Sequence, residues 1–254
     1  MTGVQTCALP IYLDGDRLLT DEATLRADEI IRRRVTRYPL QFILQESWFY
    51  GRKFFVTEAV MAPTPETELL VESGLHFIAN RKLAEPRILD MGVGSGVISV
   101  TLADEVRGCR VVALDISADA IAVARRNAID HEVTDRIEFR ESDFFAAVQD
   151  DERFDLIISN PPYIAEPDYS GLAPEVKADP KVAMTSGPEG LDAIRVMLRE
   201  GPRFLSPGGR IMFEIGHNQA ETIMAETGSD SRYTSFVLLQ DLNDRDRVII
   251  LGCD

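Results

Sequence analysis

The chain has 254 residues, of which 45% are hydrophobic and 27% are charged, a composition typical of a soluble globular protein with one large domain or one domain and a smaller appendage. Its formal net charge of −15 argues against a protein that grips nucleic acid through a basic face, so no direct nucleic-acid binding is expected. The apolar runs are too short to span a bilayer, no secretory signal opens the chain, and the three cysteines and three histidines lack metal-ligand spacing, which favours a cytoplasmic protein without a membrane or metal partner.

Residues 1–11 read MTGVQTCALPI, a segment without charge or amphipathic period. It resembles the conceptual translation of a short-read sequencing adapter. We therefore predict that this segment is not native, and that the natural part of the chain begins at about Tyr12 and has lost its true N-terminus. The alternative is a genuine but unusual leader.

A helical pattern runs from Asp21 to Arg37, because apolar residues recur there at three- and four-residue spacing among charged ones. Thr20 or Asp21 is placed to cap its start, and Pro39 ends it, since the residue before a proline is pushed out of the α region. We interpret residues 12–38 as the remnant of a small N-terminal helical domain. The apolar positions are Leu25, Ile30, Ile31 and Val35.

The next stretch, Gln41–Val60, is rich in aromatic and β-branched residues and has Gly51 between its halves, a pattern that predicts a β-hairpin. We assign this hairpin to a linker of residues 39–62 and interpret Trp48 as an anchor of its core. Two prolines then break the chain, and the spacing of the leucines predicts an amphipathic helix over Glu66–Asn80.

After Pro86 short apolar runs alternate with helical segments, which predicts βαβ units and a mostly parallel sheet covered on both faces. We therefore assign residues 63–254 to an α/β domain whose last strands, Phe236–Leu239 and Arg247–Leu251, form an antiparallel edge pair. The predicted strands before them are RILDM, RVVALDI, RIEFRES, FDLIISN and GRIMFEI. The predicted helices are Ile98–Glu105, Ala118–Ile129 and Leu191–Phe204.

A glycine-rich turn, DMGVGSG, closes the first of these strands at residues 90–96. Glycines at a strand-to-helix turn let the backbone bend sharply and let a ligand approach closely. The next strand ends in Asp115, about twenty residues further on, where a carboxylate can accept hydrogen bonds from both hydroxyls of a ribose. This spacing fits either a nicotinamide dinucleotide or S-adenosylmethionine.

Two features favour S-adenosylmethionine. The loop is GVGSG rather than GxGxxG, so it lacks the third glycine of a dinucleotide-binding turn. The third strand ends near Asp143, which can accept a hydrogen bond from an adenine amino group, with Phe144 against the ring. Asp115 and Asp143 could instead cap helices or face solvent, but at the ends of consecutive strands they point to one crevice. The predicted cofactor-binding residues are Asp90, Gly92, Val93, Gly94, Gly96, Asp115, Ile116, Asp143, Phe144 and Asn160.

The fourth strand runs into Asn160-Pro161-Pro162-Tyr163. Prolines have no N–H donor, so the carbonyls around them and the Asn160 side-chain oxygen form a cluster of acceptors for a planar NH2 group, with Tyr163 as an aromatic wall. Acceptors at both N–H groups favour positive charge as it develops on the nitrogen. We therefore predict methyl transfer to an amide or amino nitrogen, with Asn160, Pro161 and Tyr163 as catalytic residues. A proline-rich turn without function is the alternative.

These motifs resemble those of the HemK/PrmC-type protein N5-glutamine methyltransferases, which modify the glutamine of the Gly-Gly-Gln motif of peptide chain release factors. The resemblance extends from about Leu25 to Leu251 and rests on the stretches PETELLVE, DMGVGSG, NPPYI, PEGLDAIR and DLNDRDRVI. It implies a Rossmann-like, seven-stranded class I methyltransferase sheet behind a small helical domain, with S-adenosylmethionine as cofactor and a release factor as protein substrate. We expect the enzyme to be a monomer.

The resemblance also implies the residues that hold the substrate. Glu66 and Thr67 lie where the family's PETE segment approaches the active site. Three positions depart from the family's pattern: Val93 replaces its usual Thr in the cofactor loop, Thr64 replaces an Arg near the substrate entrance, and Gln45 replaces a Gly. The implied substrate-binding residues are Asn160, Pro161, Pro162, Tyr163 and Glu66.

Other functions stay open at this point. A related enzyme methylates a glutamine of a ribosomal large-subunit protein, although the EVKADP stretch of residues 175–180 favours a release factor. Adenine-N6 methyltransferases use the same motif on a flipped base, which the negative net charge disfavours. A non-catalytic module of the same fold would not need the NPPY motif. Glu214, at the end of its strand, is interpreted as structural.

Overall fold

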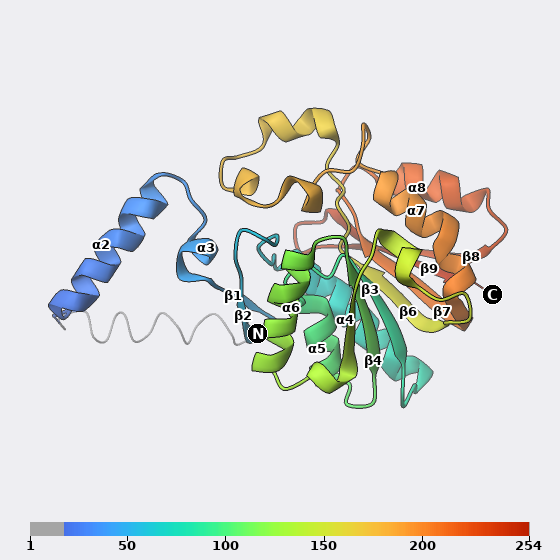
Figure 1. The fold of residues 1–254 in the computed structure, drawn as a ribbon. Helices are drawn as coiled ribbons and strands as arrows, with labels where there is room; N and C mark the ends of the chain where they lie inside the picture. Colours follow the sequence, from blue (N-terminus) through green and yellow to red (C-terminus); the bar gives the residue numbers. More distant parts are fainter. Residues whose placement is uncertain (1–17, 254) are drawn as a thin grey trace.

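The computed structural model describes residues 18–253, and its centre is a seven-stranded sheet with the order β5-β4-β3-β6-β7-β9-β8 (Figure 1). The strands from β5 to β7 run parallel, whereas β9 pairs antiparallel with both β7 and β8. The predicted mostly parallel sheet with an antiparallel last pair is therefore confirmed. The strands are β3 (Arg87–Met91), β4 (Arg110–Asp115), β5 (Ile137–Glu141), β6 (Phe154–Ser159), β7 (Leu205–Glu214), β8 (Tyr233–Gln240) and β9 (Asp246–Cys253).

Helices cover both faces of this sheet. Ile88 of β3 belongs to a core cluster with Leu70 and Val100 from the helices of one face, whereas its neighbour Leu89 belongs to a cluster with Ile194 from the other face. Because both faces are buried, the strands read as nearly continuous apolar runs. The helices are α4 (Glu66–Arg81), α5 (Val97–Glu105) and α6 (Ala118–Asp130) on the first face, and α7 (Asp192–Glu200) and α8 (Ala220–Gly228) on the second.

Short 3-10 helices fill several connections. The helix predicted over Leu191–Phe204 is divided, since α7 ends at Glu200 and Pro202 cannot donate the hydrogen bond that an α-helix would need there. Three of the short helices follow β6 in sequence, and the third of them, η5, lines the cavity described below. The 3-10 helices are η1 (Thr134–Arg136), η2 (Phe144–Ala147), η3 (Glu166–Gly171), η4 (Val176–Ala178), η5 (Lys181–Ala183) and η6 (Gly201–Phe204).

The first described helix, α2 (Asp21–Val35), projects away from the sheet (Figure 1). Its start is capped by Thr20, whose hydroxyl accepts a hydrogen bond from the backbone N–H of Ala23 at 3.2 Å. No residue of α2 is buried, and the side chains of Leu25 and Val35 are 69% and 76% exposed. The apolar face of this helix is therefore uncovered within the described part of the chain.

The predicted β-hairpin is shorter than the sequence suggested. Its first residues form a helix instead, α3 (Leu40–Leu44), which ends where Gln45 adopts a positive φ of 55°. Phe42 of α3 is buried in a cluster with Val56 and Val123, so packing against α6 overrides the β-propensity of this segment. The hairpin proper consists of β1 (Glu46–Phe49) and β2 (Arg52–Phe55).

The interpretation of Trp48 as a core anchor is wrong. Side chains alternate between the two faces of a strand, and in β1 Ser47 and Phe49 point inward, which leaves Trp48 67% exposed. The turn is made by Tyr50 and Gly51, both with positive φ, as in the two-residue turns that match the twist of a hairpin.

One buried amide joins this hairpin to the α/β domain. The Asn127 side chain in α6 accepts a hydrogen bond from the backbone N–H of Phe55 at 2.7 Å and donates to the Phe55 carbonyl at 2.9 Å. The same amide nitrogen donates to the carbonyl of Ser95 at 2.8 Å, in the glycine-rich loop. Asn127 therefore holds β2, α6 and the loop together.

We expect Asn127→Ala to lower the free energy of unfolding by about 1–3 kcal/mol, because the substitution leaves buried backbone groups of Phe55 and Ser95 without partners. Asn80→Ala, at an exposed position near the end of α4, should change it by no more than about 0.5 kcal/mol. Urea titration followed by circular dichroism measures both. Equal stability of the two variants would contradict this role of Asn127.

Candidate functional site

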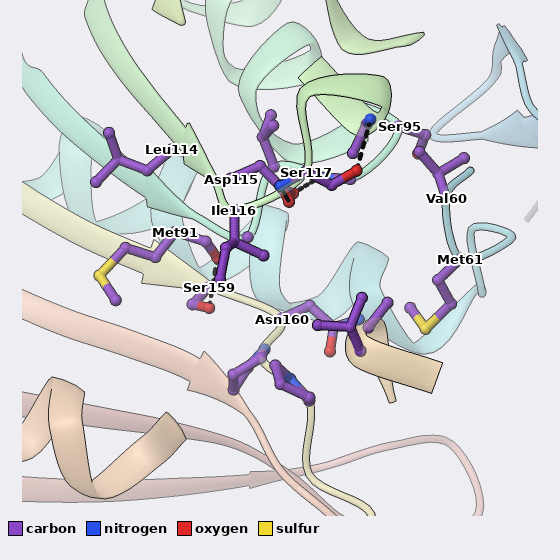
Figure 2. Close-up of a pocket in the computed structure, with 18 of the residues that line it drawn as sticks. Val60, Met61, Met91, Ser95, Leu114, Asp115, Ile116, Ser117, Ser159 and Asn160 are labelled. Atoms are coloured by element: carbon purple, nitrogen blue, oxygen red, sulfur yellow. Dashed lines mark hydrogen bonds between the residues drawn. The ribbon is translucent and has the colours of Figure 1, made fainter. Parts of the chain in front are cut away.

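A cavity of about 1190 Å³, which includes its part open to solvent, lies at the carboxyl ends of the parallel strands. Figure 2 shows Met91 and Asp115, at the ends of β3 and β4, and Asn160, just after β6, around one space. Because parallel strands end at the same edge of a sheet, residues distant in the sequence meet here. This is the crevice that the sequence predicted.

The glycine-rich loop forms the base of the cavity. Gly92 and Gly94 have positive φ values of 74° and 51°, a conformation that L side chains rarely adopt, and both line the cavity together with Val93. The backbone N–H groups of Gly92 and Val93 donate to the carbonyl of Leu114 at 2.9 and 2.8 Å, which ties the loop to β4. The predicted approach of a ligand to this loop is therefore sterically open.

Gly96 has a different role from the one predicted, because it does not line the cavity. It precedes α5 with a φ of 83°, and a Cβ at this position would lie 3.1 Å from the Cβ of Ala124 in α6. This glycine is needed for the close packing of α5 against α6.

Asp90 likewise lies behind the loop rather than in the cavity. Its side chain is completely buried, and one carboxylate oxygen accepts hydrogen bonds from the hydroxyl and the backbone N–H of Ser99 at 2.5 and 3.1 Å. Burial raises the pKa of Asp90 to about 7. The Asp90 carboxylate is therefore not placed for the predicted direct contact with a cofactor, and it holds the loop to α5 instead.

Asp115 joins the loop and lines the cavity. One of its carboxylate oxygens accepts from the backbone N–H of Gly94 and the other from that of Ser117, both at 2.9 Å. Each carboxylate oxygen can accept a further hydrogen bond, and the side chain is only partly buried. Asp115 can thus brace the loop and receive a ligand at the same time.

The remaining predicted cofactor residues surround the same space. Ile116, Asp143 and Phe144 all line the cavity, and the Ile116 side chain is 54% exposed there. The turn that carries Phe144 is held by Ser142, whose hydroxyl donates to the Phe144 carbonyl at 2.7 Å and accepts from the N–H of Ala147 at 2.9 Å. The cavity therefore combines carboxylates with apolar walls.

A roof over the cavity comes from two other segments. Val60 and Met61 line it from the stretch after the hairpin, and Val182 lines it from η5. The two segments are joined by Asp179, whose carboxylate accepts from the backbone N–H of Ala62 at 3.0 Å. Burial raises the pKa of Asp179 to about 6. Patterning of the sequence did not identify this roof.

The Asn160-Pro161-Pro162 segment lines the cavity opposite Asp115. It is anchored to β3, because the Ser159 hydroxyl donates to the carbonyl of Met91 at 2.7 Å. The Asn160 amide nitrogen donates to the Thr67 hydroxyl at 2.9 Å. Its side-chain oxygen is buried and has no hydrogen-bond partner among the described residues. The site therefore holds a buried acceptor that is not satisfied by the protein.

Tyr163 is not among the residues that line this cavity, and its predicted role as an aromatic wall for the substrate stays a prediction. Its phenol donates to Glu214 at 3.1 Å, and its carbonyl accepts from the Gln219 side chain at 2.9 Å. Burial, followed by the charge of Glu214, raises the pKa of Tyr163 well above its usual value, so the phenol keeps its proton. Tyr163 thus anchors the proline segment from behind.

Glu214 and Thr67 are the residues of this edge that sequence reasoning undervalued. Glu214 ends β7 and is 1% exposed, and it accepts from the Thr67 hydroxyl at 2.7 Å. Burial raises the pKa of Glu214, and the charge of Glu66 acts in the same direction. Glu66 itself lies outside the cavity lining. The sequence signal that could have indicated Glu214 was an acidic residue at the carboxyl end of a further parallel strand, β7.

No group of three or more His, Cys, Asp or Glu side chains in residues 18–253 is arranged to hold a metal ion. Within the same range, every helix is too short or too polar to cross a bilayer.

Comparison with known proteins identifies relatives over nearly the whole chain. The family model called methyltransferase small domain matches residues 66–175. The release factor glutamine methyltransferase of Cereibacter sphaeroides is 42% identical over 236 residues, which cover 91% of this chain and 80% of that protein. The release factor glutamine methyltransferase of Chlorobaculum tepidum is 39% identical over 246 residues, covering 94% and 83% of the two chains.

Solved structures agree on the fold. A methyltransferase from Pyrococcus furiosus superposes with a TM-score of 0.56 at 16% identity and covers 92% of this chain and 98% of that one. The hMettl16 catalytic domain superposes with a TM-score of 0.63 at 13% identity, with coverages of 85% and 90%. The sheet is thus that of a class I methyltransferase, and the sequence identities show that the chain belongs to the release factor glutamine methyltransferase family.

Proposed function

We propose that this protein transfers a methyl group from S-adenosylmethionine to the side-chain amide nitrogen, N5, of the glutamine in the Gly-Gly-Gln motif of a peptide chain release factor. The observation that carries the proposal is the buried, unpartnered side-chain oxygen of Asn160 beside the glycine-rich loop. An acceptor in that position needs a donor from a bound molecule, and a primary amide offers two.

The residues of the cavity fit the cofactor. Asp115 retains an acceptor site on each carboxylate oxygen for the two ribose hydroxyls, and Asp143 can accept from the adenine amino group. Ile116 and Phe144 provide apolar surface for the purine. Gly92 and Gly94 have no side chain, which leaves room for a ligand close to the backbone of the loop, and Val93 adds apolar surface. When bound, S-adenosylmethionine supplies a methyl group on a positively charged sulfur that can leave as a neutral thioether.

The proline segment acts on the substrate nitrogen. An amide nitrogen is a poor nucleophile because its lone pair is delocalised, and it gains positive charge as it forms the new bond to carbon. The Asn160 oxygen and the carbonyl of Pro161 accept its two N–H groups and so favour that charge. Neither Pro161 nor Pro162 has an N–H that would compete for these acceptors. Once the methyl group is attached, the nitrogen releases one proton to solvent water, which restores a neutral amide.

Residues outside the cavity lining would support these contacts. Neither Tyr163 nor Glu66 lines the cavity. Tyr163 would hold the Asn160-Pro161-Pro162 segment through its hydrogen bond to Glu214, and Glu66 would border the bound substrate. All the groups named come from one chain, so the proposed reaction needs no residue of a second copy, and we propose a monomeric enzyme. A release factor as substrate would place its activity in the cytoplasm.

We propose the division of the chain that the sequence predicts, with residues 12–38 in a small helical domain, residues 39–62 as a linker and residues 63–254 as the methyltransferase domain. The exposed apolar face of α2 supports the first part, because such a face usually packs against other helices. The predicted non-native segment, residues 1–11, lies outside the described residues. The names of the relatives favour a release factor over a ribosomal protein or an adenine base as substrate.

The direct test is mass spectrometry of a release factor incubated with this protein and S-adenosylmethionine. A gain of one methyl group on the glutamine of the Gly-Gly-Gln motif is expected, and a release factor with Ala at that position should gain none. Methylation only of a ribosomal protein or of nucleic acid offered in parallel would refute the assignment.

Asn160→Ala should lower the rate of methyl transfer by on the order of 100-fold or more, because an acceptor that stabilises developing charge is lost. The dissociation constant of the cofactor should stay within about threefold of wild type, since Asp115 and the glycine-rich loop are unchanged. Methyl transfer is followed by mass spectrometry and cofactor binding by calorimetry. Full activity in this variant would rule out the role of the Asn160 oxygen.

Asp115→Ala should have the opposite effect to Asn160→Ala, because it should weaken cofactor binding more than it slows methyl transfer. We expect the dissociation constant of S-adenosylmethionine to rise by about 10- to 100-fold, because hydrogen bonds to a charged acceptor contribute about 1.5–3 kcal/mol. Asp119→Ala, at an exposed carboxylate in the first turn of α6, is the matched control and should bind the cofactor as wild type does. The idea fails if calorimetry finds the same affinity for both variants.

A further inference from the structure

Three side chains from separate parts of the chain form a continuous line of hydrogen bonds that leads from the cavity wall, at Asn160 and Thr67, to the buried Glu214. The Asn160 amide nitrogen donates to the Thr67 hydroxyl at 2.9 Å, and that hydroxyl donates to Glu214 at 2.7 Å. Asn160 follows β6, Thr67 lies in the first turn of α4, and Glu214 ends β7. Thr67 and Glu214 are only 2% and 1% exposed, so water has little access to this line.

The number of protons determines the direction of these bonds. An ionised carboxylate only accepts hydrogen bonds, so Glu214 must receive the single proton of the Thr67 hydroxyl. The Thr67 oxygen can then only accept, which requires Asn160 to turn its NH2 group toward it. The Asn160 oxygen must consequently face away from Thr67, and it is the buried atom that lacks a protein partner. This orientation follows from donor and acceptor counting, independently of how amide oxygen and nitrogen are told apart.

We propose that Glu214 is a positioning residue that acts through Thr67 to hold Asn160 with its amide oxygen toward the substrate nitrogen. This inference rests on the proposed function, since it explains how the acceptor for the glutamine amide is kept in place. A reversed Asn160 would present N–H groups to the N–H groups of the substrate, and two donors cannot form a hydrogen bond. Glu214 therefore decides whether the site accepts a primary amide without itself touching it.

The surroundings of Glu214 bear on its charge. The Tyr163 phenol donates to it at 3.1 Å, and the guanidinium of Arg247 in β9 favours the ionised form. Burial and the nearby carboxylate of Glu66 oppose ionisation and raise the pKa of Glu214. A protonated Glu214 can donate to Thr67, which frees Thr67 to donate to the Asn160 oxygen and reverses the line. Activity that depends on this line is therefore present above the pKa of Glu214 and lost as the pH falls through it.

The first test compares two substitutions of Thr67. Thr67→Val keeps the shape of the side chain but removes the hydroxyl, and we expect the maximal rate of methyl transfer to a release factor to fall by about 10- to 100-fold through loss of orientation. Thr67→Ser restores the hydroxyl and should recover most of that loss. Cofactor affinity should change little in either variant. Thr67→Val should lower the melting temperature more than Thr67→Ser does, because it leaves the buried Glu214 carboxylate without one donor, so the rates are compared at a temperature at which both variants are folded. Equal rates for the valine and serine variants would overturn the proposal.

The second test uses the charge of Glu214. Glu214→Gln keeps the size of the side chain but no longer requires a donor from Thr67. We expect the maximal rate to fall by about 10- to 100-fold. The fall of the maximal rate with decreasing pH, expected in wild type, should be absent in this variant. Glu221→Gln, an exposed carboxylate on α8, is the matched control and should keep the wild-type profile. Circular dichroism at each pH separates this decline from unfolding. An unchanged acidic decline in Glu214→Gln would refute the proposal.

A third readout needs no substrate. The side-chain 1H–15N resonances of Asn160, assigned by their absence in Asn160→Ala, should shift as wild type is titrated toward acid and should not shift so in Thr67→Val. An identical titration in both proteins would count against the line of hydrogen bonds. If wild type binds cofactor but methylates no release factor, the proposed function fails, while this titration still decides whether Glu214 controls Asn160.

Discussion

Five neighbouring strands, from β5 to β7, run in the same direction, and their carboxyl ends therefore meet at one edge of the sheet. The meeting of the strand-end polar groups of the site depends on this constraint. Asp115 ends β4, Asn160 follows β6, and Glu214 ends β7. These side chains meet at one edge although Asp115 and Glu214 are 99 positions apart in the sequence. A reversal of any of these strands would carry its terminal residue to the opposite edge.

Hydrogen bonds between adjacent strand ends fix the positions of the loops at this edge of the sheet. The glycine-rich loop is tied to the Leu114 carbonyl and to Asp115, and Ser159 is tied to the Met91 carbonyl. The cavity and the acceptor on Asn160 are thereby held by the same strands. Side chains locked by such contacts keep the precise geometry that orientation of two reactants requires.

Two buried carboxylates at this edge are treated differently. Asp90 receives both of its hydrogen bonds on one oxygen, from Ser99, whereas Glu214 receives one on each oxygen, from Thr67 and Tyr163. Burial of a charge is costly unless hydrogen bonds compensate it, so each acid needs its partners. Glu214 differs in that one of its partners, Thr67, also accepts a hydrogen bond from Asn160. The charge of Glu214 can therefore affect the orientation of the Asn160 side chain, which lines the cavity, through hydrogen bonds alone.

The sequence by itself determined the sheet, the order of most helices and the glycine-rich and NPPY motifs, because these depend on local spacing and on residue types with strict backbone preferences. It did not determine which face a side chain takes or which distant group it meets. Trp48 turned outward, α3 replaced the start of the hairpin, and Gly96 served helix packing.

Only the tertiary structure brought Thr67 and Glu214 to Asn160 and moved Tyr163 behind the cavity. The reason is that hydrogen-bond partners on two strands and a helix are set by register and packing, which no local pattern encodes.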